Sequence, residues 1–288
     1  MNLRTDLAME DHALWRRSAK RQTKLSGVRA REETEGGVKI TSVEILDEEG
    51  ERALGKPRGT YVTLECMPAH EPAAFAAQSA LLSRHIRALL PAGAHVLVAG
   101  LGNEAVTPDA VGPLAAECVL VTRHLKTRLP EEFAAFRPVS VFRTGVLGTT
   151  GIESAALVRG VVSLVRPDRV IAVDALSARE AARLCRAVQV SDAGIVPGSG
   201  VGNARSALTE ETLGVPVVAV GVPTVVDART LCADLSGAEI DLPEDTELFV
   251  TPRDIDTRVR DSARLVGYAI DLALHDALTI EDIDMFLA

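Results

Sequence analysis

Two aspartates stand just after apolar runs of this chain, and their side chains are the ones best suited to acid–base chemistry. The run at 95–99 leads through a glycine turn to Asp109, and the run at 170–173 leads directly to Asp174. Short runs rich in Val and Ile that alternate with helical segments are typical of parallel strands in an α/β sheet. Ligands bind at the carboxyl ends of such strands. We therefore expect both aspartates to face one cleft, where two carboxyl groups can share a proton and act as base and acid.

Each of these aspartates also has a structural interpretation. Asp109 could cap the helix that follows it, and Asp174 could cap a helix that begins near Ser177. The coincidence of two acids at strand ends favours a site over two caps. Asp227 follows the apolar run at 217–221 and could be a third acid at the cleft, although a turn or cap is favoured there. Because coupled carboxyl groups titrate as a pair, the sequence leaves open which of them is the base.

A glycine turn follows the first of these strands. Gly100, Gly102 and Asn103 belong to a G-x-G-x-x-A pattern, a form of the dinucleotide-binding fingerprint. Such a site needs a continuous helix after the turn and an acid near the next strand. Pro108 interrupts the helix, and the segment 120–123 offers no acid. We therefore favour a tight turn that lets another backbone approach closely.

A second glycine-rich loop spans 191–203, after another apolar run. It carries Gly198, Ser199, Gly200 and Asn203, whose backbone N–H groups could bind an anion or a substrate backbone. The alternative is a flexible connection. Ser199 does not stand in a G-x-S-x-G motif, so a serine nucleophile is disfavoured.

Metal, membrane and nucleic-acid functions find little support in the composition. The six histidines show no H-E-x-x-H pattern and the four cysteines form no C-x-x-C pair, so a zinc site and a disulfide framework are disfavoured. The net charge of −9 argues against direct nucleic-acid binding. Neither a signal peptide nor a membrane span is recognisable, which predicts a soluble intracellular protein. At 288 residues and 47% hydrophobic content, the chain can bury a sizeable core in one large or two small domains.

The periodicity of apolar residues predicts an α/β chain with an N-terminal hairpin region at about 26–70. We expect a polar helix or arm at 8–25, a loop at 26–37, and a hairpin of 38–46 with 59–65 around a turn at 47–50. Further strands are expected at 95–99, 139–142, 169–173, 187–191, 217–221 and 247–250. Helices are expected at 72–90, 110–122, 152–165, 177–186, 257–274 and 279–287, and 230–246 is expected to be irregular.

Several of these segments together resemble a known family. The motifs lie, in order, at 4–8, 59–65, 100–103, 107–113, 145–153, 173–176, 191–203, 220–228 and 250–256. They resemble the germination proteases of spore-forming bacteria, endopeptidases that degrade small acid-soluble spore proteins at germination. So many long motifs in order are specific, whereas a single G-x-G-N would not be.

The resemblance implies a three-layer α/β/α fold with a mixed, mostly parallel sheet, similar to the hydrogenase maturation endopeptidases. It implies an inactive zymogen, a homotetramer and a location in the cytoplasm of the spore core. The family's two proposed catalytic aspartates match Asp109 and Asp174. The implied substrates are small acid-soluble spore proteins, with no membrane partner and no metal or other cofactor assigned.

The family's zymogen cuts its own N-terminal segment where an acidic residue precedes an apolar one, which matches Asp6 and Leu7. Residues 1–6 would then be a pro-segment, shorter than the family usually carries, and 7–288 a single protease domain. The polar stretch before residue 250 is also shorter than in typical members. Two alternatives remain: a metal-assisted maturation peptidase that uses the same acids, and a non-catalytic binding protein in which both aspartates are caps.

Overall fold

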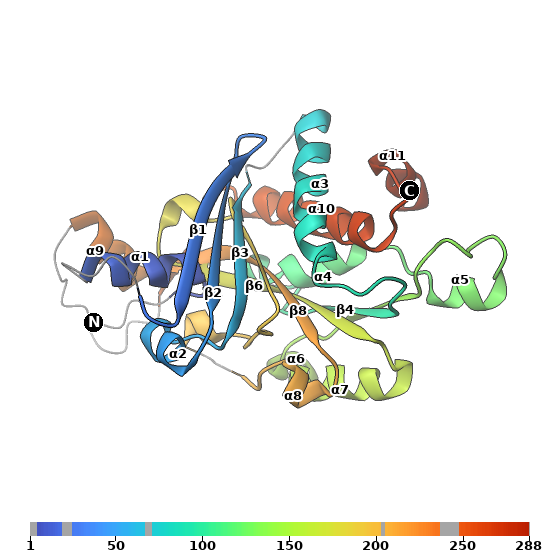
Figure 1. Cartoon of the computed structure of the whole chain (residues 1–288), viewed down its shortest axis with the longest axis horizontal. Coiled ribbons are helices and arrows are strands. Elements are labelled where there is room, and N and C mark those ends of the chain that lie inside the picture. The colour runs from blue at the N-terminus through green and yellow to red at the C-terminus, as the bar shows by residue number, and fades with distance from the viewer. Residues whose placement is uncertain (1–4, 19–24, 67–70, 203–204, 237–247, 288) are drawn as a thin grey trace.

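A mixed β-sheet runs through the molecule and carries helices on both faces (Figure 1). The computed structural model describes residues 5–18, 25–66, 71–202, 205–236 and 248–287. The strands are β1 (Val28–Glu35), β2 (Val38–Ile45), β3 (Gly59–Glu65), β4 (Val96–Gly100), β5 (Val139–Arg143), β6 (Arg169–Ala178), β7 (Val188–Ser191), β8 (Val217–Asp227) and β9 (Phe249–Val250). Their order is β1-β2-β3-β7-β8-β6-β4-β5, and β9 pairs with β8.

The sheet has a parallel half and an antiparallel half. Strands β5, β4, β6 and β8 pair in parallel, whereas β1, β2, β3, β7 and β8 pair antiparallel, as do β8 and β9. The expected α/β architecture with a mixed sheet is confirmed. The N-terminal strands make its antiparallel share larger than the "mostly parallel" description suggests.

The helices divide between the two faces. The described helices are α1 (Ala8–Ser18), α2 (Glu48–Leu54), α3 (Pro72–Arg87), α4 (Val111–Glu117), α5 (Arg123–Arg128), α6 (Leu147–Thr150), α7 (Ser154–Val165), α8 (Glu210–Leu213), α9 (Ala228–Ser236), α10 (Ile255–Leu274) and α11 (Ile280–Leu287). Helices α3, α4 and α10 cover one face, and α6, α7 and α8 lie on the other (Figure 1). None of the helices within the described ranges is long and apolar enough to cross a membrane.

The parallel strands are apolar on both faces because helices cover both. On β4, Val96 and Val98 are fully buried in the core beneath α3, α4 and α10. Leu97 and Ala99 point to the opposite face and pack against α7. This two-residue alternation divides one apolar run between two cores, which holds the strand rigidly just before the glycine turn.

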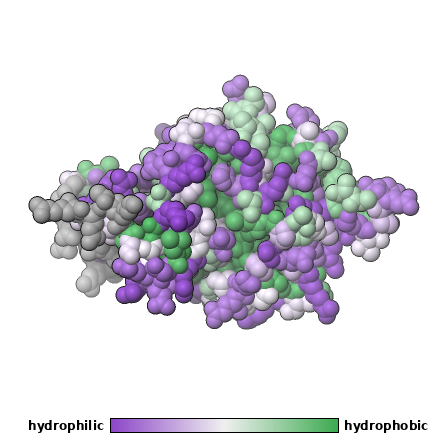
Figure 2. Space-filling model, in the orientation of Figure 1, coloured by the Kyte–Doolittle hydropathy of each residue, from purple (hydrophilic) through white to green (hydrophobic). Residues whose placement is uncertain are grey.

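The segment expected to be a loop at 26–37 is mostly a strand. Strand β1 pairs antiparallel with β2 along its whole length, from Val28 opposite Ile45 to Glu35 opposite Val38. The sequence pattern missed it because this edge strand is charged on both faces and nearly all exposed, and hydrophilic side chains cover this side of the molecule (Figure 2). Cross-strand pairing and ion pairs, such as Arg29 with Glu44, take the place of apolar alternation.

Three further expectations are wrong in detail. The turn expected at 47–50 is the start of helix α2, because the Asp47 carboxylate accepts two backbone N–H groups as an N-cap. The helix expected at 177–186 is absent: β6 continues to Ala178, paired with β8, and only a short 3₁₀ turn follows at Ala181–Arg183. Part of the stretch expected to be irregular at 230–246 forms α9, and residues 237–247 lie outside the described part of the chain.

Candidate active site

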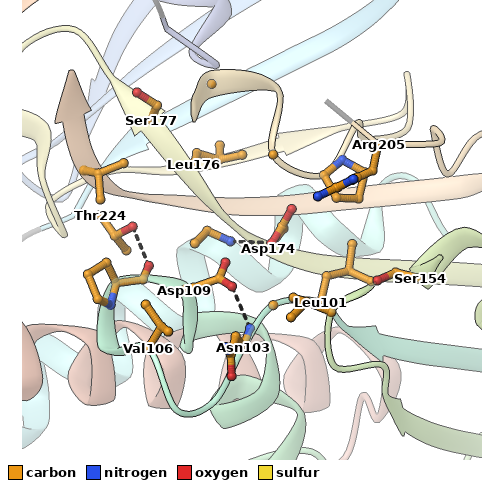
Figure 3. Close-up of a pocket in the computed structure, with 18 of the residues that line it drawn as sticks. Leu101, Asn103, Val106, Asp109, Ser154, Asp174, Leu176, Ser177, Arg205 and Thr224 are labelled. Carbon is orange, nitrogen blue, oxygen red and sulfur yellow. Dashed lines mark hydrogen bonds between the residues drawn. The ribbon is translucent and has the colours of Figure 1, made fainter. Parts of the chain in front are cut away.

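A cavity of about 550 Å³ opens near the carboxyl ends of β4 and β6 and beside β8. Figure 3 shows both predicted acids in it, Asp109 from the turn before α4 and Asp174 from β6. The expectation that the two carboxyl groups share one cleft is therefore met by the geometry. Gly102, Asn103, Gly198 and Gly200 of the two predicted glycine loops also line the cavity, whereas Asn203 lies outside the described residues.

Asp109 ends a single 3₁₀ turn, Thr107–Asp109, and its carboxylate faces back toward the glycine turn. Its Oδ2 accepts the backbone N–H of Asn103 at 2.7 Å. The N-cap residue of α4 is Ala110, so the helix-cap interpretation of Asp109 is wrong. Burial raises the pKa of Asp109, and the Asn103 N–H bond partly opposes that rise.

Asp174 sits within β6, opposite Gly221 of β8, rather than at the strand's end. Because β6 continues to Ala178, Asp174 caps no helix, and its cap interpretation is wrong as well. Its side chain is buried, and its Oδ1 accepts the backbone N–H of the next residue, Ala175, at 2.9 Å. Burial, followed by the negative charge of Asp109, raises the pKa of Asp174 well above the usual range. The two carboxyl groups are therefore electrostatically coupled.

The glycine turn lets two backbones pass very close to each other, as expected. Gly102 has φ of +114°, and a Cβ there would lie 2.1 Å from the backbone oxygen of Asp109. A Cβ on Gly100 would lie 2.5 Å from the backbone oxygen of Gly112 in α4. These contacts leave no room for a side chain, and they fix Asp109 against the end of β4.

The N-terminal segment enters the same cavity through Asp6. Its backbone N–H donates to the Ser177 oxygen at 2.9 Å, and its Oδ2 accepts the Ser177 N–H at 2.8 Å. Its Oδ1 accepts the Ser199 hydroxyl at 2.7 Å. The carboxylate of Asp6, the predicted processing residue, thus contacts both the C-terminal end of β6 and the second glycine loop.

Residues on both sides of Leu7 are tied to the sheet by one side chain. Gln189 of β7 donates from Nε2 to the Asp6 carbonyl oxygen at 3.1 Å, and its Oε1 accepts the Ala8 N–H at 2.9 Å. Leu7 itself is fully buried in an apolar cluster that includes Leu176 and Tyr61. No sequence pattern singles out Gln189, because its role depends on β7 lying beside the N-terminal segment.

Glu10 is a second anchor, and no sequence pattern singles it out. Its buried carboxylate accepts the backbone N–H groups of Arg179 and Glu180 at 2.7 and 3.1 Å and a bond from the Arg183 guanidinium at 2.8 Å. The Thr5 hydroxyl also donates to it. Glu10 therefore holds α1 to the segment that directly follows β6.

Arg205 brings a positive charge to the wall of the cavity, where Figure 3 shows its side chain on the same side as Asp174. Its guanidinium lies 3.9 Å from the Glu153 carboxylate. The only sequence signal for Arg205 is its position just after the second glycine loop.

Asp227 does not line the cavity. Its carboxylate accepts the Thr230 N–H at 3.0 Å and caps α9, so the cap that was favoured for Asp227 over a third acid at the cleft is confirmed.

The described part of the chain contains no group of three or more His, Cys, Asp or Glu side chains placed to hold one metal ion. The carboxyl groups that line the cavity are those of Asp6, Asp109, Asp174 and Glu153. Asp6, Asp109 and Asp174 accept hydrogen bonds from backbone N–H groups, and Glu153 lies beside Arg205.

Comparison with known proteins gives this arrangement a family. The model of a family described as germination protease matches residues 5–237, most of the chain. This chain belongs to the germination protease family. Membership makes it a peptidase, and the matched residues include Asp6 and both cavity aspartates.

Curated members of the family align along all or most of the chain. The germination protease of Caldanaerobacter subterraneus subsp. tengcongensis is 41% identical, over 100% of this chain and 98% of its own length. That of Clostridium tetani is 37% identical over 100% of both chains. That of Priestia megaterium is 47% identical over 81% of this chain and 66% of its own length.

Proposed function

We propose that this protein is an endopeptidase that cleaves small acid-soluble spore proteins in the spore core at germination, with Asp109 and Asp174 as its catalytic pair. The observation that carries this proposal is the pair itself: two coupled carboxyl groups with raised pKa values line one cavity in a peptidase fold. Coupled acids with unequal surroundings are a common source of paired acid and base roles.

The surroundings support a division of labour between the two acids. Asp174 is the more buried and is raised further, first by burial and then by the charge of Asp109, so it keeps the proton. Asp109 accepts the Asn103 N–H, which favours its ionised form. We assign Asp109 as the general base and Asp174 as the general acid.

In the proposed reaction, the Asp109 carboxylate takes a proton from water as the water oxygen bonds to the substrate's carbonyl carbon. Asp174 gives its proton to the carbonyl oxygen, so the tetrahedral intermediate is neutral. When the C–N bond breaks, the proton on Asp109 passes to the leaving amine, and the hydroxyl proton returns to Asp174. Each carboxyl group thus ends in its starting state.

We further propose that the chain is made as a zymogen and cuts itself between Asp6 and Leu7. Asp6 lines the cavity with both catalytic candidates. The carbonyl oxygen of that bond accepts a hydrogen bond from Gln189, which polarises the carbonyl and fixes its orientation. Residues 1–6 are then the pro-segment and 7–288 the protease domain. The homotetramer is proposed on the family resemblance and is tested by light scattering.

Digestion of a purified small acid-soluble spore protein, followed on gels, tests the central proposal. The proteins compared are the wild type, Asp109→Asn and Asp174→Asn, each with and without a chelator. Loss of cleavage in both variants, with the wild type indifferent to chelator, supports the two-aspartate protease. Loss with chelator indicates a metal-assisted peptidase instead. Retention in both variants overturns the assignment of the pair.

A further inference from the structure

Thr224 lies at an irregularity in the pairing of β8 with β6. Leu176 pairs with Pro223, but the next residue of β6, Ser177, pairs with Val225. Thr224 is therefore the extra residue of a β-bulge and lies opposite no residue of β6. Such bulges redirect a side chain, and they are frequent next to active sites.

The side chain at this bulge lines the cavity of the two acids. Thr224 is 1% exposed, and its hydroxyl donates to the backbone carbonyl oxygen of Pro108 at 2.6 Å, as Figure 3 shows. Pro108 directly precedes Asp109, so the bond holds the peptide group that joins these two residues. Without the hydroxyl, the Pro108 oxygen would lose this donor in a cavity wall that is largely shielded from water.

The peptide group between Pro108 and Asp109 is held on both sides. Its oxygen accepts the Thr224 hydroxyl, and its N–H, which belongs to Asp109, donates to the Val106 oxygen at 2.8 Å. The Asp109 carboxylate in turn accepts the Asn103 N–H at 2.7 Å. The Val106 and Asn103 contacts lie within the loop between β4 and α4, whereas the Thr224 contact ties that loop to the sheet.

A second contact holds the same turn from its outer side. The Thr107 hydroxyl donates to the Asp256 carboxylate of α10 at 2.8 Å, and this bond is exposed to solvent. Water can replace either partner of an exposed bond at little cost. The Thr224 bond is the more constraining of the two, because its hydroxyl is buried.

Strand β8 also holds the other acid in place. Asp174 of β6 pairs with Gly221 of β8, three positions before Thr224. One strand thus fixes Asp174 through the sheet and Asp109 through the Thr224 hydroxyl. Because β8 is buried along its whole length, it is a rigid support for both.

We infer that Thr224 is a positioning residue for the acid pair, and that its hydroxyl sets the distance and orientation of Asp109 relative to Asp174. It acts through the Pro108 peptide group and not on the substrate. The inference rests on the proposed function, because it names the residue that arranges the two acids of that same site. A misplacement of about 1 Å in an active site can lower a rate about 10²-fold.

Steady-state kinetics with a purified small acid-soluble spore protein test this role. Thr224→Val keeps the shape of the side chain and removes the hydroxyl, whereas Thr224→Ser keeps the hydroxyl. We expect kcat to fall about 10- to 100-fold in Thr224→Val with KM changed less than about threefold, and Thr224→Ser to recover most of the loss.

Thr63→Val is the matched control for the loss of a buried hydroxyl. Thr63 of β3 is also 1% exposed, and within the described part of the chain its hydroxyl has no hydrogen-bond partner. Thr63 does not line the cavity of the two acids. We expect Thr63→Val to keep the kcat of the wild type.

Titration of Asp174 gives a readout that does not depend on catalysis. NMR of ¹³C-labelled aspartate carboxyl groups follows it, and Asp174→Asn assigns the signal. Burial and then the charge of Asp109 raise the pKa of Asp174, so a turn that moves away should lower this pKa in Thr224→Val and leave it unchanged in Thr224→Ser and Thr63→Val. The other charged groups that line the cavity are the same in all these variants: Asp6, Glu153 and Arg205.

The outcomes separate this inference from the proposed function. Thr224→Ala removes the hydroxyl without adding a methyl group, and it replaces Thr224→Val if the latter does not fold. A folded variant without the hydroxyl that keeps the wild-type kcat, or in which the Asp174 pKa is unchanged, overturns the inference while the protease stands. Equal losses in Thr224→Ser and Thr224→Val also overturn it. If the wild type cleaves no spore protein, the proposed function is wrong, and the titration alone decides whether Thr224 positions the pair.

Discussion

Replacing Asp174 by Asn should stabilise the protein while it removes the activity. Asp174 is 4% exposed and shares its cavity with the negative charge of Asp109. Its one described hydrogen bond comes from the Ala175 N–H, which an Asn Oδ1 can also accept. The substitution keeps the size of the side chain and its hydrogen bond and removes the need to take up a proton on folding, so we expect a gain of about 1 to 3 kcal/mol in the free energy of unfolding at pH 7.

The gain should depend on pH in a direction that follows from the raised pKa of Asp174. A carboxyl group with a higher pKa in the folded state binds more protons folded than unfolded at pH values between its two pKa values. The wild type's stability therefore falls as pH rises through that window. Asn carries no such penalty, so the variant's advantage should be large at pH 7 and should vanish below the pKa of the unfolded state, at about pH 4.

Urea denaturation at pH 7 and pH 4 measures the stability effect, and digestion of a spore protein measures the activity. General acid–base catalysis contributes about 10²- to 10⁴-fold, so activity should fall by at least the lower figure. Asp109→Asn is the matched comparison, with a smaller stability gain expected because the pKa of Asp109 is raised less than that of Asp174. An Asp174→Asn protein that is less stable at pH 7, or whose gain is the same at both pH values, would refute this account of the site.

Three other substitutions test the anchors around the site. Leu7→Ala should cost about 2 to 5 kcal/mol in urea denaturation, because Leu7 is fully buried in its apolar cluster; a loss under 1 kcal/mol would mean that the segment is not firmly docked. Glu10→Ala should lower the free energy of unfolding by about 3 kcal/mol, because the backbone N–H groups of Arg179 and Glu180 and the Arg183 guanidinium lose their acceptor. Glu10→Gln should restore part of this stability, and faster hydrogen exchange at the Arg179 amide should report the same loss locally. Asp227→Ala should cost about 1 kcal/mol as a lost N-cap and leave digestion unchanged, and reduced cleavage by a stable variant would move Asp227 into the site.

The parallel half of the sheet and the acid pair were predictable because each depends on local pattern. The apolar runs that became β4 and β6 are buried on both faces, so their sequences carry an unambiguous strand signal. Asp109 and Asp174 follow or interrupt those runs as charges in apolar surroundings. The strand predicted at 169–173 ends too early, because β6 continues through Asp174 to Ala178. A charged residue normally marks the end of a buried apolar strand, so the pattern predicted a strand end at Asp174.

What the sequence could not supply were contacts between distant segments. Strand β1 is held by pairing with β2 rather than by apolar residues, so it looked like a loop. Gln189 and Glu10 carry roles that exist only because the N-terminal segment crosses the ends of β6 and β7. Their side chains satisfy backbone groups more than 160 positions away, which no local periodicity encodes.

The hydrogen bonds among Thr5, Leu7 and Glu10 have an electrostatic consequence for the proposed cleavage before Leu7. The Thr5 hydroxyl accepts the Leu7 N–H at 3.1 Å and donates to the buried Glu10 carboxylate. Glu10 lies in a cluster where Arg183 is shared with two further acids, so negative charge is in excess there. Hydrolysis before Leu7 would remove Thr5 and create an ammonium group one hydroxyl away from that carboxylate. The broken bond would thus give α1 a new ion pair, which would offset part of the hydrogen bonding that leaves with Thr5 and Asp6.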